Sequence, residues 1–230
     1  MSSNRLVRYL PFALAVLLDL AFIGIDPSLR IFSKPLLMPL LMAAYFSDVG
    51  AAKGQSKVLL AALLFSWIGD VLLMFDGRSS AFFICGLSSF LFAHVLYIAY
   101  FTGIRSDRPS YLKSRPVMLL AVVAYVFELL YILWPKLGGM RVPVTVYAIV
   151  IGTMLGCALW QYGRLDTRTA WSFISGAMFF VISDTLLAIN RFSHPLPGGG
   201  FLVMSTYCLA QFLLARGSVL HLTGSQSKTL

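Results

Sequence analysis

Apolar runs recur along the chain, and their length restricts the fold more than any other feature. A helix needs about 20 predominantly apolar residues to cross roughly 30 Å of hydrocarbon. Only 12% of the residues are charged, against about 25% in a typical soluble domain. The sequence therefore predicts an all-α integral membrane bundle of about eight helices. The expected spans are residues 8–25, 32–47, 58–75, 81–103, 116–134, 142–162, 170–190 and 201–218.

The connections between these runs are short and rich in turn-forming residues, such as DPS at 26–28 and SHPLPGGG at 193–200. None is long enough to hold a soluble domain, so we expect a single multi-pass membrane domain over residues 1–230. Arg5 and Arg8 precede the first apolar run and imitate the start of a signal peptide. That run is longer than a typical signal core and contains Asp19, so we expect it to remain as the first span.

Basic residues predict how the chain is oriented. Most of the Lys and Arg residues, including Arg5, Lys53 and Lys228, fall on the side of the N-terminus, and the opposite side holds fewer. The positive-inside rule then places both termini in the cytoplasm. The net charge of +9 is dispersed over short loops without a basic stripe, which argues against a nucleic-acid partner. Short loops and the lack of sorting signals favour a bacterial inner membrane over the endoplasmic reticulum.

Two segments of the chain resemble each other. LLFSWIGDVLLMF at 63–75 aligns without gaps on AMFFVISDTLLAI at 177–189, so that Asp70 falls on Asp184. The two carboxylates are four spans apart, so their helices run in the same direction. This suggests a 4+4 parallel internal repeat, as other membrane folds contain.

An ionisable side chain in hydrocarbon costs roughly 2.5–3.5 kcal/mol on insertion scales, so Asp70 and Asp184 need a reason to be there. Each could be structural, satisfied by a polar partner on a neighbouring helix, but two acids in matching contexts favour a functional site. We expect Asp19 and Glu128 to be structural or solvated. Other polar side chains can converge at the depth of the two acids: Ser66, His94, Tyr97, Tyr207 and Gln211.

Two carboxyl groups in a low-dielectric site can divide their roles, with one holding a proton while the other is ionised. Such a pair suits hydrolysis through an oxocarbenium ion, as in glycosidases. It also suits a proton-coupled transporter or channel, or an intramembrane aspartyl protease, and the residues alone do not choose among these functions. Cys85, Cys157 and Cys208 show no paired spacing, so neither disulfides nor a metal site nor any cofactor is expected.

Five motifs in series resemble the lysoplasmalogenase (YhhN-like) family of membrane proteins. They are KPLLMP at 34–39, WIGDVLLMF at 67–75, AHVLY at 93–97, FFVISDTLLAINRF at 179–192 and MSTYCLAQ at 204–211. The resemblance covers nearly the full chain. It implies hydrolysis of the vinyl ether bond of lysoplasmalogens, which yields a fatty aldehyde and glycerophospho-ethanolamine or -choline.

The chemistry of vinyl ether hydrolysis then suggests roles for residues. Asp70 and Asp184 would be the catalytic acid and base, and the substrate would be a lysophospholipid already dissolved among the membrane lipids. The lipid phosphate would meet Lys34 or a basic residue such as Arg191, although Lys34 could equally snorkel to the interface as an anchor. The residues expected to bind or orient the substrate are His94, Tyr97, Tyr207, Gln211, Lys34, Ser66 and Asn190.

Overall fold

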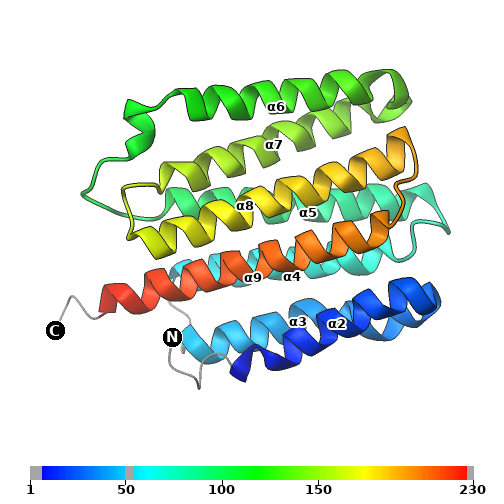
Figure 1. The fold of residues 1–230 in the computed structure, drawn as a ribbon, viewed down its shortest axis with the longest axis horizontal. Coiled ribbons are helices and arrows are strands. Elements are labelled where there is room, and N and C mark those ends of the chain that lie inside the picture. The colour runs from blue at the N-terminus through cyan, green and yellow to red at the C-terminus, as the bar shows by residue number, and fades with distance from the viewer. Residues whose placement is uncertain (1–6, 50–53, 227–230) are drawn as a thin grey trace. The chain divides into compact units, whose positions relative to one another are not determined.

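The computed structural model describes residues 7–49 and 54–226, and its regular elements in these ranges are all helical (Figure 1). The predicted all-α membrane fold is therefore confirmed. Arg5, Lys53 and Lys228, which entered the predicted orientation, lie outside the described residues. The long helices are α2 (Leu10–Ile25), α3 (Arg30–Val49), α4 (Gly54–Leu73), α5 (Ser80–Thr102), α6 (Val117–Leu133), α7 (Arg141–Trp160), α8 (Thr167–Ala188) and α9 (Gly199–Gln226).

Seven of the helices in the described part of the chain, α3 to α9, are long and apolar enough to cross a membrane. The remaining helix, α2, is apolar but has only 16 residues. At 1.5 Å per residue it extends about 24 Å, which is less than the roughly 30 Å hydrocarbon core. The eight expected spans thus correspond to eight helices, of which the first is shorter than a full crossing.

The chain divides into two compact units. Unit 1 takes in the residues up to Tyr100 and those from Ser218 onward, and unit 2 comprises Phe101–Gly217. Unit 1 thus contains α2, α3, α4 and most of α5, while unit 2 contains α6, α7, α8 and most of α9. The division falls inside α5 and again inside α9. The parallel repeat, the single membrane domain and the orientation stay predictions.

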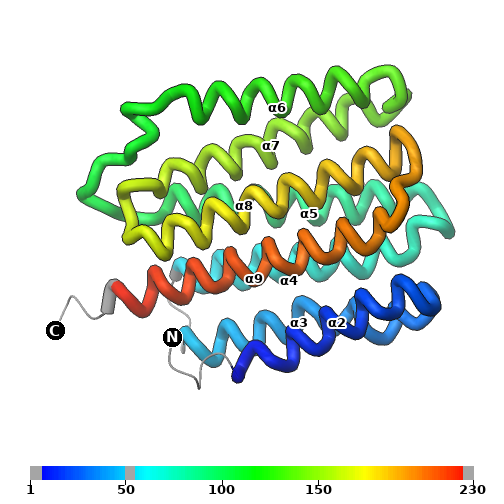
Figure 2. The backbone as a smooth tube through the Cα atoms, in the orientation of Figure 1, coloured from blue at the N-terminus to red at the C-terminus, as the bar shows by residue number. Residues whose placement is uncertain are grey.

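In unit 1, α2 and α3 form a helical hairpin closed by a short 3-10 helix, η1 (Pro27–Leu29), whose path Figure 2 shows. Asp26 caps η1, since its carboxylate accepts a hydrogen bond of 2.9 Å from the Ser28 backbone N–H. That hydrogen bond favours the charged form and lowers the pKa of Asp26 below its ordinary value. The turn residues DPS therefore fold as the sequence predicts.

A buried acid joins the two helices of this hairpin. Asp19 of α2 is 1% exposed and receives hydrogen bonds from both Nε (3.3 Å) and Nη2 (3.0 Å) of Arg30 on α3. Ser33 donates a third hydrogen bond of 2.7 Å from its hydroxyl. Asp19 thus has the structural role that the sequence predicts for it.

In unit 2, α7 packs against both α6 and α8. Gly152 of α7 allows the close approach of α6, because a Cβ atom there would lie 2.7 Å from Cγ2 of Val126. Asp166 caps α8 by accepting a hydrogen bond of 3.1 Å from the Thr169 backbone. A π-helical turn, η5 (Ile189–Ser193), follows α8 and leads into the loop before α9. Glu128 of α6 is exposed, as expected.

We predict that Arg30→Met lowers the free energy of unfolding, because it leaves the Asp19 carboxylate buried without its cation. Removing one partner of a buried ion pair costs about 3–5 kcal/mol, and the partial exposure of Arg30 places the loss at the lower end. Thermal unfolding in detergent measures the effect. The double variant Arg30→Met/Asp19→Asn should recover part of the loss. A loss no larger than that of Arg78→Met, at an exposed loop position, would contradict this role.

Candidate functional site

The region around Asp70 begins with two prolines inside α3, Pro35 and Pro39. A helical N–H normally donates to the carbonyl four residues earlier, so Pro39, which has no N–H, leaves the Pro35 carbonyl without its usual donor. The indole Nε1 of Trp67 on α4 donates a hydrogen bond of 2.8 Å to this carbonyl oxygen. The proline thus creates an acceptor inside the helix, and the tryptophan uses it to tie α4 to α3.

One turn from Trp67 on the same helix, Asp70 meets a cation from α3. The Lys34 ammonium lies 3.7 Å from Oδ1 of Asp70, and both side chains are buried. The anchoring interpretation of Lys34 is therefore wrong, because the side chain turns inward to an acid and does not snorkel to the membrane interface. The contact thus joins α3 and α4 through a buried acid and a buried cation.

The neighbouring surface of unit 1 is polar and buried. Ser66 lies one turn before Asp70 on α4, and both Ser66 and Tyr97 of α5 are fully buried. His94 is also fully buried, and its Nδ1 lies 2.6 Å from the Phe90 carbonyl oxygen. Since a carbonyl oxygen can only accept, Nδ1 carries the proton, and in the neutral ring Nε2 is an acceptor. Unit 1 therefore places the Lys34 ammonium beside Asp70, a contact that the sequence did not predict.

Asp184 has a different local environment in unit 2. Its Oδ2 accepts a hydrogen bond of 2.6 Å from the hydroxyl of Tyr147 on α7. Next to it, the hydroxyls of Tyr125 and Thr185 form a hydrogen bond across α6 and α8. These side chains line a small cavity of about 40 Å³ whose other walls are aliphatic. No Lys, Arg or His lines this cavity among the described residues, so phenol and hydroxyl groups supply its polarity.

The three other predicted site residues of unit 2 lie in separate surroundings. Tyr207 of α9 is buried, with its ring edge-on to Phe180 at a centroid distance of 5.6 Å. Gln211, one turn further along α9, is fully buried. Asn190 is exposed in η5, where its side-chain oxygen accepts a hydrogen bond of 2.9 Å from the Leu196 backbone. Asn190 thus fixes the loop before α9, and its contact with substrate stays a prediction.

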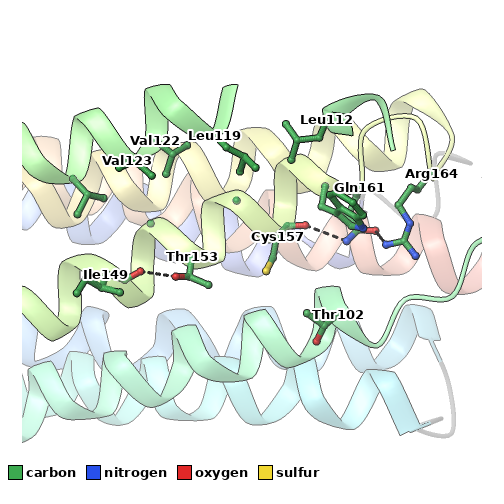
Figure 3. A pocket seen from close by; sticks show the side chains of 14 residues that line it. Thr102, Leu112, Leu119, Val122, Val123, Ile149, Thr153, Cys157, Gln161 and Arg164 are labelled. Atoms are coloured by element: carbon green, nitrogen blue, oxygen red, sulfur yellow. Dashed lines mark hydrogen bonds between the residues drawn. The ribbon is translucent and has the colours of Figure 1, made fainter. Parts of the chain in front are cut away.

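A groove runs along α7 on the side that faces α6 (Figure 3). Its volume is about 840 Å³, within the range of about 300–1,000 Å³ typical of small-molecule sites. Leu119, Val122 and Val123 of α6 form one wall, as Figure 3 shows, and the polar end holds Gln161 and Arg164. Three residues line both this groove and the cavity of Asp184, so the two are neighbours: Val122, Val126 and Gly152.

Basic side chains gather in the segments that close unit 2 beyond Asp184. Lys136 donates a hydrogen bond of 2.7 Å to Ser193, and the guanidinium of Arg141 lies over the Trp134 ring at 5.1 Å. Arg191 is exposed and lies seven residues after Asp184, about 10 Å along the helical axis. These three cations form what we call the basic end of unit 2: Lys136, Arg141 and Arg191.

Sequence reasoning found both acids but missed their nearest polar partners. Tyr147 and Tyr125 were overlooked because a tyrosine within an apolar run is typical of a lipid-facing or interfacial position. Trp67 belongs to the motif WIGDVLLMF, but the sequence predicted no role for its side chain. The one signal in the sequence for a partner of Trp67 was Pro39, the second proline of KPLLMP. A proline inside a helix leaves the carbonyl four residues earlier without its hydrogen-bond donor. The pairing of Asp70 with Asp184 joins residues of the two units and stays a prediction.

A search of the described residues finds no group of three or more His, Cys, Asp or Glu side chains able to hold a metal ion. The polar groups described in the helices of the two acids and in their neighbours include hydroxyls, carboxyls, the His94 imidazole and the Lys34 ammonium. Such groups transfer and hold protons, and they can stabilise a charge that develops on a neighbouring substrate.

Comparison with known proteins relates the chain to one family of proteins. The model of the YhhN family matches residues 29–218. Lysoplasmalogenase TMEM86B of Sus scrofa is 35% identical over 174 residues, covering 76% of this chain and 69% of that protein. Lysoplasmalogenase TMEM86A of Homo sapiens is 33% identical and covers 70% and 65%. The lysoplasmalogenase of Mycobacterium tuberculosis is 32% identical and covers 71% and 60%. No solved structure matches the chain.

We predict that Lys34→Met destabilises the protein, because Asp70 would be left buried without its cation. The matched control is Lys57→Met, which removes the same side chain from an exposed position on α4. The double variant Lys34→Met/Asp70→Asn should unfold at a higher temperature in detergent than Lys34→Met alone. If the second substitution instead adds its own independent loss, the two side chains do not interact as described.

Proposed function

The chain belongs to the YhhN family, and we propose that it is a lysoplasmalogenase, a membrane hydrolase that cleaves the vinyl ether bond of lysoplasmalogens. The observation that carries the proposal is the similarity to relatives from mammals and mycobacteria that bear this name. The products are a fatty aldehyde and glycerophospho-ethanolamine or -choline. The local environments of Asp70 and Asp184 support acid-base catalysis without a cofactor.

We assign different roles to the two acids. Asp70, with the Lys34 ammonium 3.7 Å away, is the carboxylate that acts as base. Asp184, whose cavity supplies a phenol and hydroxyls, holds the catalytic proton on the oxygen that does not accept from Tyr147. The phenol of Tyr147 keeps the carboxyl group oriented while its other oxygen faces the substrate. This division follows the general rule that differing environments separate the roles of paired acids.

Hydrolysis begins when the Asp184 carboxyl group transfers its proton to the β-carbon of the vinyl ether. The double bond's electron pair forms the new C–H bond, and the positive charge is shared by the α-carbon and the ether oxygen. This oxocarbenium ion is stabilised by the carboxylate groups that face it. Water then attacks the α-carbon, and Asp70 accepts a proton from the attacking water, which gives a neutral hemiacetal.

The hemiacetal breaks down with the roles reversed. Asp70, now protonated, gives its proton to the glycerol oxygen as the C–O bond breaks. The Asp184 carboxylate accepts the proton of the hemiacetal hydroxyl as the aldehyde C=O forms. Both acids thereby return to their starting states, and one water is consumed for each aldehyde and each glycerol product. His94, Tyr97, Tyr207, Gln211 and Ser66 are proposed to orient the acids or the water.

The lipid head group belongs at the basic end of unit 2. The Lys34 ammonium lies 3.7 Å from Asp70, and we therefore assign the phosphate to other cations. Arg191 lies about 10 Å along the helix from Asp184, a spacing that suits the short glycerol link between the phosphate and the vinyl ether. Lys136 and Arg141 place two further cations in the same closing segments.

Asp184→Asn and Asp70→Asn should each reduce aldehyde release from a lysoplasmalogen by at least about 10²-fold, because each removes a proton-transfer group. The readout is kcat for the purified protein in detergent or liposomes. The losses in kcat caused by two groups that act in one reaction do not multiply. The double variant should therefore have a kcat close to that of the slower single variant. Glu128→Gln, at an exposed acid, serves as the control.

Folding must be separated from chemistry in this experiment, because Asp70→Asn leaves a buried ammonium. Thermal unfolding of each variant provides that check, and Asp70→Asn/Lys34→Met supplies a base-free protein without the unpaired cation. Wild-type protein that releases no aldehyde would contradict the proposed function. A folded single variant of either acid that keeps near-full activity would contradict its role. Proton flux in liposomes without lipid turnover would favour the transporter that the sequence also allowed.

Arg191→Gln should raise KM for lysoplasmalogen several-fold while it leaves kcat nearly unchanged, since a head-group contact made equally in the ground and transition states affects binding alone. The effect should weaken at high salt, which screens exposed charges. Arg108→Gln, at an exposed loop before α6, is the matched control. An unchanged KM for Arg191→Gln would remove this residue from the head-group site.

A further inference from the structure

We propose that the groove between α6 and α7 holds the alkenyl chain of the substrate and that Gly156 determines the longest chain accepted. This inference rests on the proposed function and extends it to the part of the lipid that does not react. The groove, shown in Figure 3, lies wholly within unit 2, and three of its lining residues also line the cavity of Asp184. A chain lying in the groove therefore has one end beside the residues that surround the proposed catalytic acid.

The length of the groove suits one lipid chain. It extends along α7 from Ile149 to Gln161, twelve residues apart, which is about 18 Å. The chains of one leaflet fill about half of the roughly 30 Å hydrocarbon core, so a groove of this length accommodates a single chain. The walls are aliphatic over most of this distance, with valine and leucine from α6 facing the glycines of α7.

Two glycines one turn apart on α7, Gly152 and Gly156, shape the floor of the groove, but they differ in the space around them. A Cβ atom at Gly152 would clash with Val126 at 2.7 Å, so this glycine is needed for the packing of α6 on α7. A Cβ atom at Gly156 would meet only Leu119, at an ordinary contact distance of 3.5 Å. Alanine therefore fits at Gly156, whereas a larger side chain would extend into the groove and block its far half.

The polar end of the groove is built to close it and not to bind an anion. Arg164 donates from Nη2 to the Ile104 carbonyl at 3.0 Å and from Nη1 to the Gln161 side chain at 3.3 Å. Gln161 in turn donates from Nε2 to the Phe101 and Cys157 carbonyls, each at 3.1 Å. These side chains form hydrogen bonds within the protein and close this end of the groove. The methyl end of the alkenyl chain therefore lies here. The cations for a phosphate lie at the opposite end of unit 2.

The test measures how chain length affects kcat/KM for aldehyde release. Wild-type protein, Gly156→Leu and Gly156→Ala are compared on lysoplasmalogens with octadecenyl and with decenyl chains. Gly156→Leu should lower kcat/KM for the long chain by at least about tenfold while it keeps most of the activity on the short chain. Gly156→Ala should behave like wild type. Gly24→Leu, at an exposed glycine of α2 with no neighbour within 4 Å of an added Cβ, is the control outside the groove.

A second measurement reports binding without turnover. Trp160 lines the far half of the groove. A non-hydrolysable alkyl ether lysolipid with bromine atoms near the end of its chain should quench the fluorescence of Trp160. The quenching should shrink in Trp160→Phe and in Gly156→Leu, and a lipid brominated next to the ether should quench this residue less.

The outcomes separate this inference from the proposed function. Wild-type protein that releases no aldehyde, yet shows chain-end quenching at Trp160, contradicts the enzyme activity and keeps the groove as a lipid-chain site. Active wild-type protein whose Gly156→Leu variant loses activity equally on both chains, or on neither, overturns the chain-length role. If Arg164→Met raises KM equally for long and short chains, the phosphate binds at the polar end and the proposed direction of the lipid is wrong.

Discussion

A charge placed in hydrocarbon must find its partner within the protein, and in unit 1 this requirement organises the helices. Arg30 and Lys34 lie one turn apart on α3, and each forms an ion pair with an acid of a different helix, Asp19 on α2 and Asp70 on α4. The two cations thus hold their neighbours from one central helix. Because each unpaired charge would cost several kcal/mol, α2, α3 and α4 are coupled electrostatically as well as by packing.

The prolines of α3 extend this coupling to the backbone. A carbonyl that has lost its helical donor is costly in a membrane, where no water replaces the missing hydrogen bond. Trp67 supplies that donor from α4, one turn before the residue that meets Lys34. The Trp67 indole and the Asp70 carboxylate therefore join α4 to α3 at two adjacent points. The hydrogen bond of Trp67 to α3 also helps to hold Asp70 in place, because the two residues lie one turn apart on α4.

Several of these features could be predicted from the sequence, for reasons that are physical. Apolar run lengths determine the helices because lipid allows few other structures, and Asp26 caps a turn within the DPS segment that the sequence predicts. The similarity of 63–75 to 177–189 identified both acids. The partners of the two acids were harder to predict, because a contact between two helices depends on how each helix is rotated about its own axis. Lys34 was compatible with an interface anchor, and Tyr147 with a lipid-facing side chain, until the packing of α3 and α7 was known.

The two acids show how similar sequence contexts lead to different surroundings. Each lies near the C-terminal end of its helix, with two leucines following, yet Asp70 faces an ammonium and Asp184 faces a phenol. A cation favours the carboxylate, whereas a cavity of aliphatic walls and hydroxyl groups is able to hold a neutral carboxyl group. A vinyl ether needs one group of each kind, since carbon protonation requires an acid and water attack requires a base. The difference in partners, and not the aspartates themselves, is what makes an acid-base division of labour chemically reasonable.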